Sequence, residues 1–133
     1  MTSSAELPVN SNSDVVLVRQ NVRTAALDVG LSLVDQTKVV TAASELARNA
    51  LVYAGGGQVR IEIVHSGVRR GLRLTFSDEG PGIPDIQQAL VDGWTTGGGL
   101  GLGLSGSRRL VDEFDVKSAP GEGTLITVTK WAR

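Results

Sequence analysis

The sequence predicts an α+β fold: a two-layer sandwich in which a mixed, mostly antiparallel sheet carries helices on one face. Three observations support this. Two early stretches, 14–29 and 35–54, have apolar residues at helical spacing. Two middle stretches, 58–65 and 72–78, alternate apolar and polar residues, as half-buried strands do. A further alternating stretch lies near the end of the chain, at 124–130. This order of helices and antiparallel strands favours one sheet covered on a single face.

The two early stretches have helix boundary signals. Ser13 or Asp14 can cap the start of the first helix, and Gly30 can end it. The second helix is stopped by the glycines at 55–57. The apolar stripe of the first helix is Val15, Val18, Val22, Ala25, Ala26 and Val29, and that of the second is Val39, Ala43, Leu46, Ala50 and Ala54.

The middle strands are expected to form a hairpin, because only the turn at 66–71 separates them. The second of these strands runs into Asp78. The elements expected after it are a short helix at 84–91, a loop at 92–99, a helix at 104–111, a short strand at 116–119, a turn at 120–123 and the last strand.

Length and composition are typical of one soluble domain. The chain has 133 residues, 41% of them hydrophobic and 20% charged. We expect a flexible N-terminal segment at 1–12, with a short extended piece at 7–9, and a single domain at 13–133. Neither a signal peptide nor a bilayer-spanning apolar run is evident, so the expected location is cytoplasmic.

Several function classes are disfavoured by composition. The net charge of −1 indicates neither a nucleic-acid partner nor a membrane partner. The absence of cysteine removes disulfides, thiol catalysis and thiolate metal sites. The single histidine, His65, disfavours a histidine-rich metal centre or a Ser-His-Asp triad.

A glycine-rich run at 97–104 is the most unusual stretch of the chain. Five of its eight residues are glycine, and leucines alternate with the last of them. Glycine disfavours a helix interior, so the run is expected to be a loop leading into the helix that begins near Leu104. Bare N–H groups beside a helix N-terminus suit a phosphate chain. The alternative is a flexible linker, although linkers usually combine glycine with serine rather than with regular leucine.

Glu45 and Asn49 are four residues apart in the second predicted helix, so their side chains share one face. Leu46 and Ala50 put this pair at the edge of the buried stripe. A carboxylate beside a carboxamide suits a divalent ion and general-base chemistry. On spacing alone, an ordinary solvated helix face that includes Arg48 is the favoured explanation of the pair.

Asp78 ends a buried strand and is followed by Gly80, Pro81 and Gly82. A carboxylate held at a strand end beside glycines can accept hydrogen bonds from a planar amino group. A turn that merely ends the strand is the alternative.

Two familiar nucleotide-binding motifs do not explain this sequence. Gly101, Gly103 and Gly106 match G-x-G-x-x-G, but no strand directly precedes them, so a dinucleotide-binding βαβ unit is rejected. No Gly-Lys-Ser/Thr occurs, which excludes a Walker-type loop.

Three short stretches nevertheless occur in a characteristic order: Glu-Leu-Ala-Arg-Asn at 45–49, Asp-Glu-Gly-Pro-Gly at 78–82 and Gly-Leu-Gly-Leu-Gly at 99–103. They resemble the N, G1 and G2 boxes of the GHKL ATP-binding superfamily, which includes DNA gyrase B, MutL proteins, histidine kinases and bacterial anti-sigma serine kinases. Gly-Glu-Gly-Thr at 121–124 resembles a further box near the last strand. The resemblance spans about residues 13–133 and implies the Bergerat, or GHKL, fold.

The subgroup it most resembles is the anti-sigma-type serine/threonine kinases, in particular the switch kinases of the stressosome. The chain has no room for the second domain of gyrase-like proteins. A histidine kinase needs a phospho-acceptor histidine on an upstream helical hairpin, whereas His65 lies at a predicted strand end. The short segment between the G1 and G2 boxes also fits this subgroup.

The resemblance implies a role for each matching residue. Asn49 would bind Mg²⁺, and Glu45 would take the proton from an attacking serine or threonine hydroxyl. Asp78 would bind the adenine amino group of ATP, with Thr124 acting through water. The glycines would lie near the nucleotide: Gly80 and Gly82 would let it approach, and Gly99, Gly101 and Gly103 would hold its phosphates.

No lysine lies in or beside these boxes. The positive charge near the γ-phosphate would come from Mg²⁺, backbone donors, or an arginine such as Arg48 or Arg108.

The function implied by this resemblance is a Mg·ATP-dependent kinase acting on STAS-domain scaffold and antagonist proteins of a stress-signalling complex. Phosphorylation would release the kinase to engage a downstream regulator. Trp94, between the G1 and G2 boxes, is either a partner contact or a core residue. A second hypothesis is a nucleotide-dependent module that sequesters a sigma factor or regulator without phosphoryl transfer. A third is an ATPase fragment of a larger GHKL protein.

Overall fold

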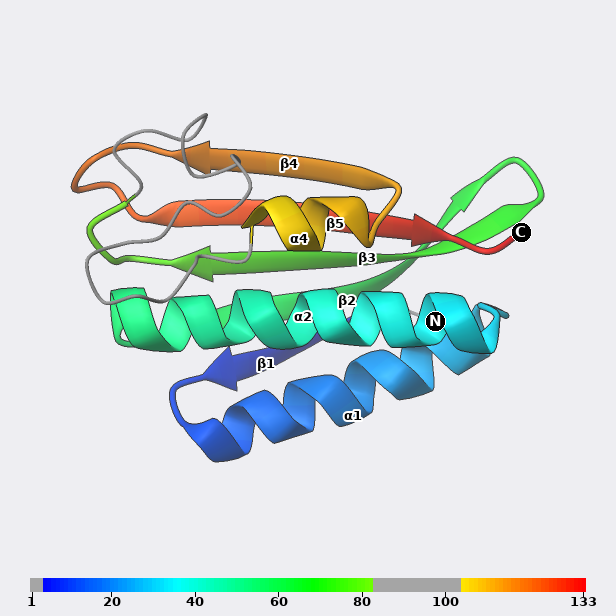
Figure 1. Ribbon diagram of the computed structural model, residues 1–133, viewed down its shortest axis with the longest axis horizontal. Helices are drawn as coiled ribbons and strands as arrows, with labels where there is room; N and C mark the ends of the chain where they lie inside the picture. The colour runs from blue at the N-terminus through cyan, green and yellow to red at the C-terminus, as the bar shows by residue number, and fades with distance from the viewer. Residues whose placement is uncertain (1–3, 83–103) are drawn as a thin grey trace.

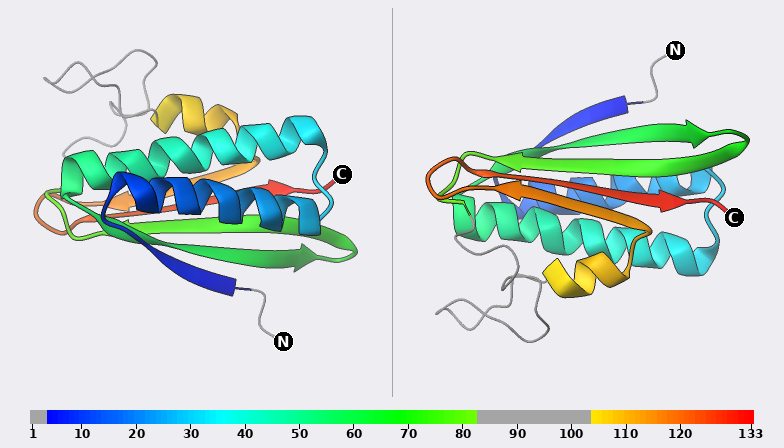
Figure 2. Two further views of the ribbon diagram at one scale, coloured as in Figure 1. Left: turned by 90° about the horizontal axis from the view of Figure 1, so that it is seen from below. Right: turned by 90° about the horizontal axis from the view of Figure 1, so that it is seen from above.

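The computed structural model describes residues 4–82 and 104–133 and has two layers (Figure 1). Five strands form one sheet in the order β1-β2-β3-β5-β4, and every neighbouring pair in it is antiparallel. The described helices all lie on one face of this sheet (Figure 2). The elements are β1 (Ser4–Val9), α1 (Asn12–Asp28), α2 (Leu33–Ala54), β2 (Gly57–Ser66), β3 (Arg69–Asp78), α4 (Leu104–Arg109), β4 (Glu113–Ser118) and β5 (Thr124–Trp131). The predicted α+β sandwich is confirmed, with a fully antiparallel sheet among these strands.

Both long helices begin at a serine cap that sequence spacing did not single out. Ser11, rather than Ser13 or Asp14, caps α1: its Oγ accepts the N–H of Asp14. Ser32 caps α2 in the same way through the N–H of Asp35. In both cases the aspartate lies in the first turn, where a negative charge is favourable. The helices therefore start two residues earlier than predicted.

The N-terminal segment contributes more structure than the expected short piece at 7–9. Residues Ser4–Val9 form the edge strand β1, which pairs with Gly57–Glu62 of β2. This pairing is favourable because Leu7 lies opposite Val59 on the face that the helices cover.

The predicted hairpin is present and tighter than expected, since Ser66 pairs with Arg69 and only two residues form its turn. The later elements are displaced by a few residues from their predicted positions. The helix α4 ends at Arg109 instead of 111, and β4 covers Glu113–Ser118 instead of 116–119. The expected helix at 84–91 and loop at 92–99, with Trp94, lie outside the described residues.

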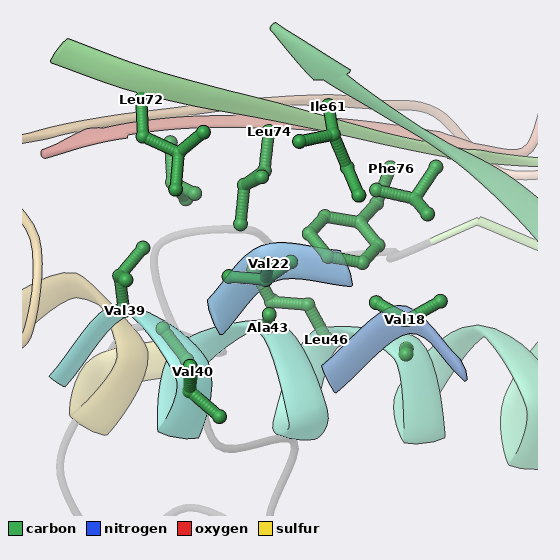
Figure 3. Packing of buried hydrophobic residues seen from close by; sticks show 14 of the residues in the cluster. Val18, Val22, Val39, Val40, Ala43, Leu46, Ile61, Leu72, Leu74 and Phe76 are labelled. Atoms are coloured by element: carbon green, nitrogen blue, oxygen red, sulfur yellow. The ribbon is translucent and has the colours of Figure 1, made fainter. Parts of the chain in front are cut away.

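The core fills the space between the sheet and the helices (Figure 3). Leu72, Leu74 and Phe76 of β3 point toward the layer that holds Val39, Ala43 and Leu46 of α2 and Val18 and Val22 of α1. All eight side chains are buried, and the small alanines of α2 let the helix lie close to the sheet. This packing fixes α2 across the inner face of the sheet.

A charged cluster joins the N-terminal end of α2 to the last strand. The Lys130 side chain is only 6% exposed, and its ammonium lies 3.5 Å from Asp35 and 3.4 Å from Asp112. Asp112 also accepts the Trp131 backbone N–H at 2.7 Å and pairs with Arg133 at 2.7 Å. A buried ammonium needs such partners.

No helix in residues 4–82 and 104–133 is long and apolar enough to cross a bilayer.

Candidate functional site

The strands β3 and β4 end, and β5 begins, at the side of the molecule reached by the C-terminal end of α2 (Figure 1, left). Asp78 is the last residue of β3, Ser118 is the last residue of β4, and Thr124 is the first residue of β5. Thr124 pairs with Asp78 on one side and with Ser118 on the other. The three residues therefore stand in one row across the sheet.

The row faces the helices. Asp78 and Thr124 are each two residues from a buried core side chain, Phe76 and Ile126 respectively, and side chains two apart in a strand share a face. By the same alternation Ser118 lies on the face of Val116, which packs against the core. All three residues line one hollow.

The Asp78 carboxylate is half-buried and partly oriented by its own turn. The Gly80 backbone N–H donates to Asp78 Oδ1 at 3.0 Å. Among the described residues this is its only hydrogen bond, so the other oxygen, Oδ2, remains an acceptor for a ligand.

The Thr124 hydroxyl belongs to a small hydrogen-bond network. Ser118 Oγ lies 2.9 Å from Thr124 Oγ1 and also donates to the Gly123 carbonyl at 2.9 Å. Sequence reasoning missed Ser118. The signal that could have identified Ser118 was its place near the end of an alternating strand, on the same face as Val116 and shortly before the turn at 120–123.

The glycines of the G1 box are pressed against other protein segments. A Cβ on Gly82 would lie 2.1 Å from the Ala119 carbonyl oxygen, and the φ of Gly82 is +80°. Close to it, the Gly121 N–H donates to the Pro81 carbonyl at 2.8 Å. A side chain at 82 would force the turn after β3 away from the β4–β5 turn. Close backbone packing thus explains why glycine is needed here, independently of any nucleotide.

Glu45 and Asn49 lie on α2, both half-buried, beside the buried Leu46 and Ala50. The far end of the same helix contacts the strand ends, because Ala54 touches Gly80. At a rise of about 1.5 Å per residue, Asn49 is about 7.5 Å and Glu45 about 13.5 Å along the helix axis from Ala54. Along the helix axis, Asn49 is therefore nearer to the Asp78 end of the site, and Glu45 lies farther from it.

The predicted site residues thus fall into three groups. The first group lies at the strand ends and consists of Asp78, Gly80, Gly82 and Thr124. The second lies along the neighbouring helix and consists of Asn49 and Glu45. The third lies outside the described residues and consists of Gly99, Gly101 and Gly103. Arg48 and Arg108 are exposed. Within the described part of the chain, no three His, Cys, Asp or Glu residues group to hold a metal, so a cation here would depend on a smaller protein ligand set.

A two-layer fold that carries the N box on a helix and the G1 box at the end of a strand is typical of one class of nucleotide-dependent proteins. Residues 34–133 match the family described as histidine kinase-, DNA gyrase B- and HSP90-like ATPases, and the chain belongs to this family. The resemblance to the GHKL superfamily is thereby confirmed.

Within that family, the chain is 50% identical over 120 residues to the serine/threonine-protein kinase RsbT of Bacillus subtilis, covering 90% of both chains. It is also similar to anti-sigma F factors. The factor of Caldanaerobacter subterraneus subsp. tengcongensis is 30% identical over 97 residues, which cover 70% of this chain and 68% of that protein.

Solved structures agree on the fold. The structure of the RsbU and RsbW domains of Rv1364c from Mycobacterium tuberculosis superposes with a TM-score of 0.68 at 21% identity, covering 99% of this chain and 33% of that one. The catalytic domain of the histidine kinase ThkA gives a TM-score of 0.54 at 18% identity, covering 96% and 94%.

Proposed function

We propose that this protein is a Mg·ATP-dependent serine/threonine protein kinase of the cytoplasm. It would phosphorylate STAS-domain scaffold and antagonist proteins of a stressosome-type complex and then be released to engage a downstream regulator. The observation that carries the proposal is one hollow at the strand ends, lined by Asp78, Ser118 and Thr124, in a chain that is 50% identical to the kinase RsbT along 90% of its length.

The described residues fit an adenine nucleotide. Asp78 offers a carboxylate oxygen at the strand end, and Thr124 offers a hydroxyl beside it. An amino group with two protons is the natural partner for such acceptors. Asn49 and Glu45 follow further along α2, and the phosphate chain is proposed to lead from the base toward them. The glycines Gly99, Gly101 and Gly103 are proposed to donate backbone N–H groups to the phosphates.

The donor chemistry also fits magnesium. Asn49 offers an amide oxygen, a hard ligand of the kind that Mg²⁺ prefers, and Mg²⁺ usually keeps several waters and phosphate oxygens besides its protein ligands. When bound, the ion supplies neutralisation of the phosphate charge.

Glu45 is proposed as the general base. As the substrate hydroxyl oxygen forms its bond to the γ-phosphorus, the bond to the β,γ-bridging oxygen breaks and ADP leaves. The hydroxyl proton passes to the Glu45 carboxylate. Glu45 is half-buried on α2 and one helical turn from Asn49, so a base and a magnesium ligand lie side by side.

A second candidate function is a nucleotide-dependent module that sequesters a sigma factor or regulator without phosphoryl transfer. The similarity to anti-sigma F factors, 30% identity over 70% of this chain, is the observation that favours it.

One experiment separates the two functions. The protein is mixed with the STAS-domain proteins of its own organism and Mg·ATP, and phosphoserine and phosphothreonine are measured by mass spectrometry. The kinase hypothesis expects labelling of a STAS protein that Glu45→Gln lowers at least 100-fold, with ADP affinity unchanged. Glu62→Gln, a carboxylate on the opposite face of the sheet, is the matched control and should label normally. ATP-dependent partner binding without any labelling would support the second function instead.

A further inference from the structure

We propose that Ser118 is a positioning residue that sets the direction of the Thr124 hydroxyl proton. By doing so it makes the hollow prefer a purine with an amino group at position 6 over one with a carbonyl there. This inference rests on the proposed nucleotide function of the same site.

The proton count of the network carries the argument. A serine hydroxyl has one proton and two lone pairs, whereas a carbonyl oxygen can only accept. Ser118 Oγ lies 2.9 Å from the carbonyl of Gly123, a buried residue, so the serine proton points to that oxygen. The contact between Ser118 Oγ and Thr124 Oγ1, also 2.9 Å, then needs its proton from Thr124. The reverse direction would take the serine proton away from the Gly123 carbonyl.

The consequence falls on the side of Thr124 that faces the ligand. With its proton engaged by Ser118, Thr124 Oγ1 presents only lone pairs to the hollow. Its strand neighbour Asp78 likewise presents a carboxylate oxygen. Two acceptors in a row match the N–H protons of a 6-amino purine directly or through water. They repel the lone pairs of a 6-oxo purine.

The surroundings hold Ser118 in this position. Its strand ends at a turn that packs against the G1 box, residues 78–82. A Cβ on Gly82 would lie 3.2 Å from Ser118 Oγ. Ser118 itself is half-buried and pairs with Thr124 in the ladder. The two hydroxyls therefore have a fixed separation set by the backbone.

The test measures binding of ADP and IDP, which differ at position 6, by titration calorimetry on the full chain with Mg²⁺. The wild type is expected to prefer ADP. Ser118→Ala should reduce the ADP-over-IDP preference about fivefold to tenfold, because the Thr124 hydroxyl is then free to donate to the 6-oxo group. Thr124→Val should reduce the preference similarly, and adding Ser118→Ala to it should have no further effect.

Two control variants separate positioning from general damage. Ser118→Thr keeps the hydroxyl and should retain the preference. Thr75→Val removes a hydroxyl from the opposite face of β3, at a residue that does not line the hollow, and should change neither affinity.

Equal weakening of ADP and IDP by Ser118→Ala would overturn the inference, since a purely structural role predicts it. An additive effect of the two substitutions would overturn it as well. If Ser118→Ala does not fold, as judged by circular dichroism, the preference in Thr124→Val decides, and an unchanged preference there overturns the inference. A folded wild type that binds neither nucleotide overturns the proposed function itself and, with it, this inference.

Discussion

Gly80 and Ala54 lie so close together that a Cβ on Gly80 would stand 2.5 Å from the Ala54 Cβ. The contact joins the last turn of α2 to the turn that follows β3. Because Asn49 and Glu45 lie on α2 and Asp78 begins that turn, this contact sets the spacing between the two halves of the candidate site.

Gly80→Ala should therefore destabilise the protein by about 1–3 kcal/mol, since the added methyl group would overpack the contact. Urea denaturation measures the free energy of unfolding. Gly106→Ala is the matched control: no atom of the described residues lies within 4 Å of a Cβ there, and the residue is in α4, so stability should be unchanged or rise by up to about 1 kcal/mol. Adding Ala54→Gly to Gly80→Ala should recover part of the loss. Equal stabilities of the two single alanine variants would contradict the tight contact.

Asp78→Asn should weaken ADP binding by about 10- to 100-fold with little change in stability. The amide oxygen of asparagine can still accept the Gly80 N–H, but its NH₂ group then meets the amino group of the base. Calorimetry measures the affinity, and Glu79→Gln, the exposed neighbouring carboxylate, is the control that should bind normally. Undiminished affinity in Asp78→Asn would remove Asp78 from base recognition.

The cluster around Lys130 should make stability depend on pH in the acid range. Burial raises the pKa of Asp112, but the Trp131 backbone N–H and the charges of Lys130 and Arg133 outweigh it, and the pKa lies below its ordinary value. A lowered folded-state pKa means that the stabilisation is complete above the unfolded value of about 3.9 and disappears as the pH falls through the folded value.

Asp112→Asn should consequently cost about 0.5–1 kcal/mol at pH 7, since solvent screens this exposed carboxylate and Lys130 keeps Asp35 as a partner, and the difference from the wild type should shrink toward pH 3. Urea denaturation across this pH range checks the expectation. Glu6→Gln breaks the exposed pair with Arg60 and should leave the stability at pH 7 essentially unchanged. A constant difference between Asp112→Asn and the wild type at all pH values would argue against a charge effect.

Ser107→Ala should leave the protein equally stable or stabilise it by about 0.5–1 kcal/mol. Ser107 is 1% exposed, and its Oγ has no hydrogen-bond partner within the described part of the chain. Removing an unsatisfied buried hydroxyl from a helix relieves a desolvation penalty and improves helix propensity. Thermal or urea unfolding measures the effect, with the exposed hairpin residue Ser66 replaced by alanine as the comparison. A loss above about 1 kcal/mol would mean that the hydroxyl has a partner in solution.

Periodicity alone predicted most of the framework. The alternation around Val59 and Leu74 and the helical stripe through Leu46 identified the β2–β3 hairpin and α2, because a buried face repeats with the period of its element. Boundaries were less accurate. Ser11 and Ser32 cap helices whose starts were expected at later residues, since cap geometry depends on where the chain leaves the preceding strand or turn.

The strand β1 shows a different limit of sequence reasoning. Ser4–Val9 has little alternation of its own and becomes a strand because the edge of β2 is available for pairing. Such an edge is a long-range feature, and local propensity does not report it.

Residue order along the chain was enough to identify the family and to propose which side chains act on the nucleotide, because three boxes with suitable chemistry follow one another in a characteristic order. The fold alone determined that Asp78, Thr124 and Ser118 stand abreast on one face, and that Gly80 and Gly82 are required by contacts with Ala54 and Ala119. The physical reason is that strand register and close backbone packing join segments that are far apart in the chain, as Asp78 and Thr124 are, and local sequence does not report such contacts.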